Sequence, residues 1–137
     1  NRTGDDWMQD CLFCKITKGE VASETLYEDE IVKVFLDINP STNGDCMIVP
    51  KKHVVTIEDL DDELILHMHK IALKMKALLT EKLNCAGLTI AINNGYGQDI
   101  KHFHMHLTPR YQDDELTHSF NTRNLLPITE VKKQILS

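Results

Sequence analysis

Several features that would place the chain in a specialised class are missing from its sequence. No apolar run approaches the roughly 20 residues of a membrane span, and no secretory signal is visible, so we expect a cytoplasmic protein without a membrane partner. Cations are in the minority, with 15 Lys and Arg against 21 Asp and Glu and a net charge of −6. Because nucleic-acid-binding domains usually carry an excess of cations, this charge argues against DNA or RNA as the main partner. There are also no internal repeats.

What the sequence does contain is typical of one globular domain. The chain has 137 residues, of which 42% are hydrophobic and 26% charged, enough for a single core. Residues 1–7 precede a methionine and lack apolar periodicity, so we expect a leader left by the expression vector, followed by one domain over 8–137. Of the four cysteines, Cys11 and Cys14 form a C-x-x-C pair. In a cytosolic chain this pair indicates metal or redox chemistry before a structural disulfide.

Hydrophobic patterns predict a mixed architecture. Short apolar or alternating runs predict strands over residues 25–27, 31–36, 46–49, 88–92 and 101–110. Apolar spacings of three and four predict a long helix over Asp61–Leu83, and a short C-terminal helix is expected over Leu126–Leu136. Strands, one long helix and further strands indicate an α+β fold with an antiparallel sheet. We expect His67 and His69 on solvated faces of the long helix and residues 112–115 as a solvated acidic run.

The most unusual stretch is Lys101–Arg110, which holds three of the seven histidines at a period of two: His102, His104 and His106. Because a strand sends alternate side chains to opposite faces, the histidines should share one face while the apolar residues between them face the core. Two chemistries fit such a row. Zinc or iron could bind, since H-x-H on a strand offers two imidazoles. Phosphorus chemistry also fits, since a neutral imidazole is a nucleophile and a second one can donate to a phosphoryl oxygen.

The motifs together resemble the histidine triad (HIT) superfamily. The spaced histidines with apolar intervening residues are similar to the family's signature, and Asn93-Asn94-Gly95 with Gly97-Gln98 resembles its phosphate loop. Further landmarks occur in the family's order at Cys11–Ile16, Phe35–Ile38 and Pro50–His53. The resemblance implies a five-stranded antiparallel sheet with one main helix. It also implies a homodimer that continues the sheet across two subunits.

The resemblance further implies a reaction at the α-phosphate of a purine nucleotide conjugate, such as a dinucleoside polyphosphate or a nucleoside phosphoramidate. His104 would be the nucleophile that forms a covalent nucleotidyl-histidine, and His106 would donate to a nonbridging oxygen or assist the leaving group. Asp37 would accept from the ribose hydroxyls. The residues implied to bind the nucleotide are Phe13, Phe35, Asp37, Ile38, Asn93, Gly97, Gln98 and Asp99. The family often has Ser or Thr where Asp99 stands, and the loop before it looks shorter than in many relatives.

A second constellation consists of Cys11, Cys14, His53 and His102. A C-x-x-C pair with two histidines is a good tetrahedral zinc set. Because protein would fill all four positions, we expect this zinc to be structural, and the nucleotide chemistry to need no metal. Two other functions stay open at this point. One is a metal-dependent H-x-H-x-H protein of the cupin or oxidoreductase kind, and the other is a non-catalytic nucleotide-binding or interaction module.

Overall fold

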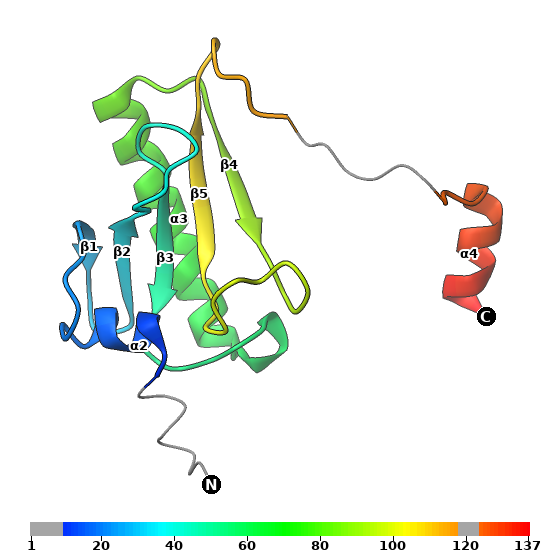
Figure 1. Ribbon diagram of the computed structural model, residues 1–137, viewed down its shortest axis with the longest axis horizontal. Coiled ribbons are helices and arrows are strands. Elements are labelled where there is room, and N and C mark those ends of the chain that lie inside the picture. Colours follow the sequence, from blue (N-terminus) through cyan, green and yellow to red (C-terminus); the bar gives the residue numbers. More distant parts are fainter. Residues whose placement is uncertain (1–9, 118–123) are drawn as a thin grey trace, which may run out of the picture.

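The protein is described by a computed structural model for residues 10–117 and 124–137, so the leader expected at residues 1–7 lies outside the described residues. Five strands form one antiparallel sheet in the order β1-β2-β3-β5-β4, as predicted for the α+β class (Figure 1). The strands are β1 (Thr25–Glu28), β2 (Val32–Leu36), β3 (Cys46–Pro50), β4 (Gly87–Ile92) and β5 (Met105–Arg110). The helices are α2 (Leu12–Thr17), the 3-10 helix η1 (Ile57–Asp59), α3 (Asp62–Leu83) and α4 (Ile128–Leu136). None of the helices in the described ranges has the length and apolar character needed to cross a membrane.

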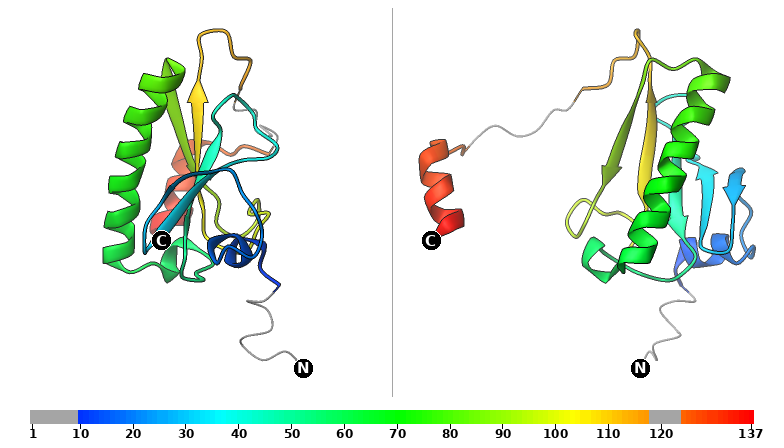
Figure 2. Two further views of the ribbon diagram at one scale, coloured as in Figure 1. Left: turned by 90° about the vertical axis from the view of Figure 1, so that its left-hand side faces the viewer. Right: turned by 180° about the vertical axis from the view of Figure 1, so that it is seen from behind.

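The long helix α3 covers one face of the sheet, and α2 lies on the other (Figure 2). Asp61 caps α3 by accepting from the Leu64 amide, and Asn84 ends it in the left-handed conformation. Its buried side chains, which include Met68 and Met75, pack against one set of strand residues. Burial of this apolar stripe against the sheet is the main stabilisation of the domain.

Alternation along the strands separates two apolar clusters. Val34 and Ile48 face α3 in the larger cluster, whereas their neighbours Phe35 and Met47 face the opposite side in a smaller cluster with Phe13 of α2. The side chains of a strand point alternately to the two faces, so every second residue of β2 and β3 is available to the α2 face. This face carries the candidate site.

Strand β5 starts at Met105, four residues later than the predicted start at residue 101. The preceding residues use their polar groups elsewhere: the Phe103 amide donates to the Val54 carbonyl, and His102 Nε2 bonds the Pro50 carbonyl. The expected alternation nevertheless holds on the core side. Phe103 and Leu107 belong to the α3-facing cluster, and Met105 packs against it.

The prediction that His67 lies on a solvated helix face was wrong. Its Nε2 lies 2.7 Å from Asp29 Oδ2, and its side chain is only 25% exposed. Asp29 follows β1 and also accepts from the amides of Ile31 and Val32 and from the Tyr27 hydroxyl. This carboxylate therefore ties α3 to the turn between β1 and β2.

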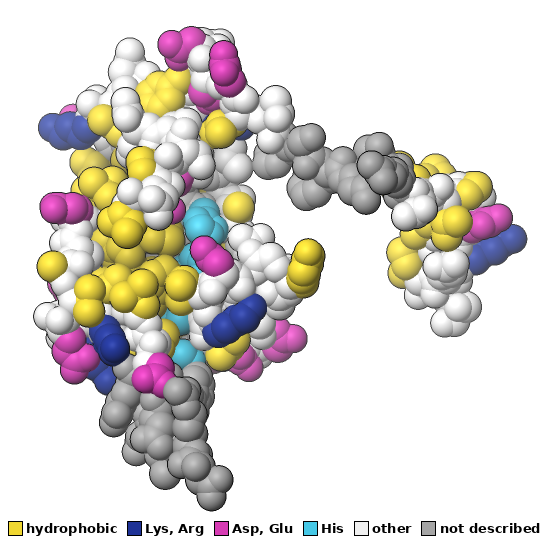
Figure 3. Space-filling model, in the orientation of Figure 1, with side chains coloured by type: hydrophobic (Ala, Val, Ile, Leu, Met, Phe, Trp, Pro, Cys, Tyr) yellow, Lys and Arg dark blue, Asp and Glu magenta, His cyan; other side chains and the backbone are white. Residues whose placement is uncertain are grey.

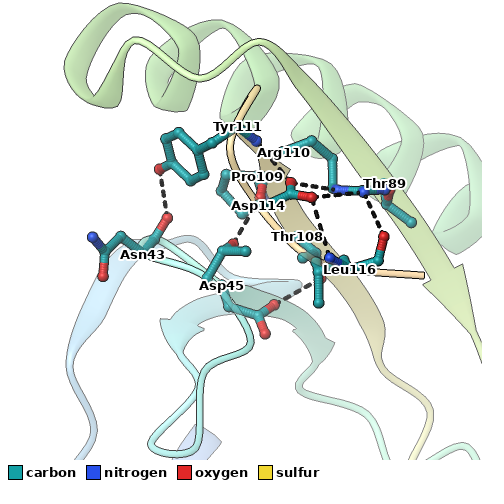
Figure 4. A network of polar contacts seen from close by, with 10 residues as sticks. Asn43, Asp45, Thr89, Thr108, Pro109, Arg110, Tyr111, Asp114 and Leu116 are labelled. Atoms are coloured by element: carbon teal, nitrogen blue, oxygen red, sulfur yellow. Dashed lines mark hydrogen bonds and ion pairs between the residues drawn. The ribbon is translucent and has the colours of Figure 1, made fainter.

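The prediction that residues 112–115 form a solvated acidic run was wrong for Asp114. Its carboxylate accepts from Arg110 Nε and Nη2 and from the Tyr111 amide, as Figure 4 shows. Arg110 also donates to Thr89 Oγ1 and to the Leu116 carbonyl, which fastens the turn after β5 to β4. Beyond this turn, α4 lies well away from the sheet (Figure 1), and its apolar residues are largely exposed.

Candidate active site and metal centre

A cavity of about 260 Å³ lies on the sheet face opposite α3. A row of paired residues forms part of its wall: Phe35 pairs with Met47, and Met47 pairs with His106 across β2, β3 and β5. Phe13 of α2 adds an aromatic ring edge-on to Phe35 at a centroid distance of 5.6 Å. Figure 3 shows histidine side chains beside an apolar area on this face. The site thus combines an apolar surface with imidazoles.

The cavity brings together most of the residues predicted to act on a nucleotide. Those that line it are Phe13, Phe35, Asp37, Ile38, Asp99, His104 and His106. The lining also includes apolar residues that the sequence patterns did not single out as ligand contacts, among them Val21, Met47 and Ile100. Alternation along β3 could have indicated Met47, because residue 48 belongs to the core face. No comparable signal marks the residues contributed by the loops.

The three phosphate-loop residues do not line this cavity. The Gln98 side chain is buried and donates to the Val55 carbonyl at 2.7 Å while accepting from the Gly95 amide at 3.2 Å. Gly97 has a φ of +97°, a conformation that favours glycine, and Asn93 is exposed. In this arrangement Gln98 holds the loop in place, and the direct phosphate contacts of all three residues stay a prediction.

His104 is held as a neutral imidazole with a defined tautomer. Its Nδ1 lies 2.8 Å from the His102 carbonyl, which can only accept, so Nδ1 carries the proton and Nε2 carries the lone pair. Nε2 is buried and has no hydrogen-bond partner among the described residues. Burial lowers the pKa of His104, although the hydrogen bond to His102 and the carboxylates of Asp99 and Asp37 act in the opposite direction. A neutral imidazole with an unused lone pair is the form in which histidine acts as a nucleophile.

The charged groups around His104 are acidic. Asp99 Oδ1 lies 3.7 Å from His104 Nε2, and the Asp99 side chain is 80% exposed. The lining residues, all of which are described, include Asp37 and Asp99 but no Lys or Arg. The nearby Lys101 ammonium donates to the Gln98 carbonyl at 2.7 Å and to the Gly95 carbonyl at 3.3 Å. The cavity is therefore apolar on one side and anionic near the reactive nitrogen.

A Cys/His cluster consistent with zinc binding lies next to this cavity. One atom from each of Cys11, Cys14, His53 and His102 falls within 4.8 Å of the others. Cys14 Sγ lies 3.1 Å from His53 Nδ1 and 3.5 Å from His102 Nδ1, and Cys11 Sγ lies 3.3 Å from His102 Nδ1. Tetrahedral zinc with ordinary Zn–S and Zn–N bonds separates its ligand atoms by about 3.3–3.8 Å. The donor set and its spacing fit zinc.

The protonation of the cluster also suits a metal. His102 Nε2 donates to the Pro50 carbonyl at 2.7 Å, which leaves Nδ1 unprotonated and directed at the cysteines. Burial lowers the pKa of His102 to about 4 and also lowers that of His53, so both imidazoles are neutral. Burial and the neighbouring Cys11 raise the pKa of the Cys14 thiol to about 12. A buried thiol of this kind becomes a thiolate when a cation supplies the balancing charge.

Comparison with known sequences gives consistent matches. A family model described as "HIT domain" matches residues 18–113. An uncharacterised HIT-like protein of Methanocaldococcus jannaschii is 38% identical over 127 residues, or 91% of this chain and 98% of that protein. An adenylylsulfatase of Arabidopsis thaliana is 34% identical over 93% of this chain and 66% of its own length. An adenosine 5'-monophosphoramidase of Saccharomyces cerevisiae is 36% identical over 73% of this chain and 62% of its own length.

Solved structures share the fold. The structure of SMU.412c from Streptococcus mutans superposes with a TM-score of 0.82 at 34% identity, covering 94% of this chain and 83% of the other. A zinc-bound histidine triad family protein from Mycobacterium smegmatis superposes with a TM-score of 0.76 at 32% identity, covering 83% and 84% of the two chains.

Proposed function

The chain belongs to the HIT family, and on this premise we propose that it hydrolyses purine nucleotide conjugates at the α-phosphate, through a covalent intermediate on His104. Two relatives support a nucleotide substrate, since one is named an adenylylsulfatase and the other an adenosine 5'-monophosphoramidase. In both of these names the substrate joins an adenylyl group to a small leaving group. The observation that carries the proposal for this chain is the tautomer of His104.

The reaction follows from that tautomer. The Nε2 lone pair of His104 attacks the α-phosphorus, and the bond from phosphorus to the leaving atom breaks with its electron pair remaining on that atom. His106, whose ring centroid lies 4.7 Å from that of His104, would donate to a nonbridging oxygen. Water then attacks the phosphorus, breaks its bond to Nε2 and releases the nucleoside monophosphate. The His102 carbonyl holds the Nδ1 proton of His104 throughout, so the ring keeps its orientation.

The rest of the cavity would hold the nucleoside. Phe13, Phe35 and Ile38 offer apolar surface to a purine, and Ile38 is 89% exposed, as expected of a residue that a ligand covers. Asp37 lies at the end of β2, where its carboxylate could accept from the ribose hydroxyls. Asn93 and Gly97 are proposed to contact phosphate through the loop that Gln98 anchors.

The proposed zinc site would stabilise the same region. Cys11, Cys14, His53 and His102 would hold the ion, which would supply the positive charge that balances two thiolates. The zinc-bound relative from Mycobacterium smegmatis supports this assignment. His102 would take part in both sites, because its side chain belongs to the cluster and its carbonyl orients His104. The zinc would therefore position the nucleophile without touching the substrate.

We also propose a homodimer that continues the sheet through β4. This strand is at one edge of the sheet, and Ile90 on it is 49% exposed. An unpaired strand edge with exposed apolar residues favours pairing with a second chain. The exposed apolar residues of α4 add surface that a partner subunit could cover.

Trapping the intermediate tests the proposed chemistry. Adenosine 5'-phosphoramidate is mixed with excess enzyme, the reaction is quenched within milliseconds, and peptide mass spectrometry locates the adenylyl group. We expect the adduct on His104. His104→Asn should abolish turnover while adenosine monophosphate still binds, and the exposed His69→Asn serves as the matched control. Turnover by His104→Asn near the wild-type rate would contradict the covalent mechanism.

Chelator treatment and the trapping experiment together distinguish the proposed mechanism from the two alternative functions. A metal-dependent H-x-H-x-H protein would lose activity with excess chelator while its fold remained intact by circular dichroism. A non-catalytic module would bind the monophosphate but form no adduct and release no product.

A further inference from the structure

We propose that Asp99 makes the site discriminate between leaving groups by charge, so that conjugates with an amine leaving group are favoured over those with an anionic one. This inference rests on the function proposed above and names the substrate class within it. It is carried by the position of one carboxylate and by the charge of the whole cavity.

The cavity has no cation to offer a second anionic group. Asp37 and Asp99 line it, and no Lys or Arg is among its lining residues, all of which are described. Lys101 is close in sequence, but its ammonium is bonded to the carbonyls of Gln98 and Gly95. His104 and His106 can serve the charge of one α-phosphate. Any further negative charge on the leaving group would meet carboxylates without compensation.

Asp99 lies close to the nitrogen of His104 that is proposed to react, in the lining of the same cavity. For attack, the phosphorus must come to about 3 Å from His104 Nε2, with the leaving atom one bond farther out. A carboxylate oxygen that lies 3.7 Å from the same nitrogen is therefore at most roughly 7 Å from the phosphorus and roughly 8 Å from the leaving atom. The Asp99 side chain is 80% exposed, so it has room to turn from the phosphorus towards the leaving group without breaking core contacts. The Asp99 carboxylate accepts a hydrogen bond from the Ile100 amide at 3.0 Å, which is local to the loop.

The two classes of leaving group present different atoms to this carboxylate. An ionised carboxylate can only accept hydrogen bonds. A phosphoramidate joins phosphorus to an N–H, which can donate to Asp99, and the nitrogen departs with its electron pair and takes up one proton from water. A phosphoanhydride or a phosphosulfate has a bridging oxygen without hydrogen and brings an anion next to Asp99. One such charge pair, about 6 Å apart in a half-solvated site, changes a rate or an affinity about tenfold.

A substitution that removes only the charge tests the inference. Specificity constants are measured at neutral pH for an adenosine 5'-alkylphosphoramidate and for adenosine 5'-phosphosulfate, with wild-type protein, Asp99→Asn and Glu81→Gln. Glu81 is exposed near the end of α3, away from the cavity lining, so its variant makes the same change in net charge elsewhere. Because sulfate and amines differ in intrinsic reactivity, the ratio of the two specificity constants is compared between proteins. We expect Asp99→Asn to shift the ratio at least tenfold towards the phosphosulfate, and Glu81→Gln to shift it less than twofold.

A binding measurement keeps the test independent of turnover. In a His104→Asn background, with and without Asp99→Asn, calorimetry gives the dissociation constants of the same two compounds. A tenfold shift of their ratio towards the phosphosulfate supports the role of Asp99, even if the enzyme forms no adduct and the proposed function fails. Equal effects of Asp99→Asn on both compounds, in turnover and in binding, would overturn the inference, because Asp99 would then act only on His104 or on the loop.

Discussion

The carboxylate of Asp29 gives the most quantitative prediction for the stability of the domain. It accepts four hydrogen bonds, from the amides of Ile31 and Val32, the Tyr27 hydroxyl and His67 Nε2. Burial alone would raise the pKa of Asp29, but these four hydrogen bonds outweigh burial and lower the pKa from its ordinary 3.8 to about 2. A shift of this size corresponds to about 2 kcal/mol of unfolding free energy.

The sign follows from the direction of the shift. Because the pKa of Asp29 is lower in the folded state, its stabilisation is fully present above the unfolded value of about 3.8 and is lost as the pH falls through about 2. Asp29→Asn keeps an acceptor for the two amides but removes the charge at every pH. We therefore expect this variant to lose about 2 kcal/mol at pH 7, and the loss to vanish as the pH approaches 2.

The difference in unfolding free energy between wild type and Asp29→Asn is measured by urea unfolding, followed by circular dichroism. The measurement is repeated from pH 7 down to the lowest pH at which both proteins fold. Release of a bound metal in acid would affect wild type and variant alike, so the difference between them isolates Asp29. The exposed Asp113→Asn is the control for a lost surface charge. A variant as stable as wild type at pH 7, or a deficit that does not shrink in acid, would refute the reasoning.

Three further predictions concern the proposed sites and the tail. Protein purified without added metal should contain about one zinc per chain by elemental analysis. The double variant Cys11→Ser, Cys14→Ser should contain no zinc and should melt at a lower temperature. Metal-free wild-type protein of undiminished stability would count against the site. Asp37→Ala should weaken ribonucleotide binding by about 1.5–3 kcal/mol and 2',3'-dideoxynucleotide binding much less, and equal losses in calorimetry would exclude a ribose contact. Truncation after Thr117, which keeps the Asp114 network, should change the ranking of leaving groups more than the affinity for a nucleoside monophosphate, provided light scattering shows an unchanged oligomer.

Sequence patterns predicted most helices and strands because each of these elements depends on residues that are close together in the sequence. The spacing of apolar residues marked α3 to within one residue, and Asp61 differs only because it is the cap. The environment of His67 could not be predicted, because its partner Asp29 is 38 positions away and no periodic pattern links them. Asp114 lies only four positions from its partner Arg110, but nothing in the sequence marks the turn beyond β5 that brings the two side chains together.

The candidate site was predictable where motifs converge and unpredictable where loops contribute. The spaced histidines and the C-x-x-C pair marked the residues that the structure gathers around the cavity and the Cys/His cluster. Spacing alone could not indicate that Gln98 turns towards the Val55 carbonyl, because that contact depends on how two loops meet. It also could not indicate how close Asp99 comes to His104.

The pairing of β3 with β5 has a consequence for how the protein can misfold. Met47 lies opposite His106 on the cavity face, and Ile48 lies opposite Met105 on the α3 face. A slip of β3 by one position would turn Ile48 towards the cavity and Met47 into the helix interface, since the side-chain period of a strand is two. The same slip would break the pairing of Met47 with His106 and so disturb the row of residues beside the histidines. Core packing and the cavity wall therefore depend on the same register of β3 against β5.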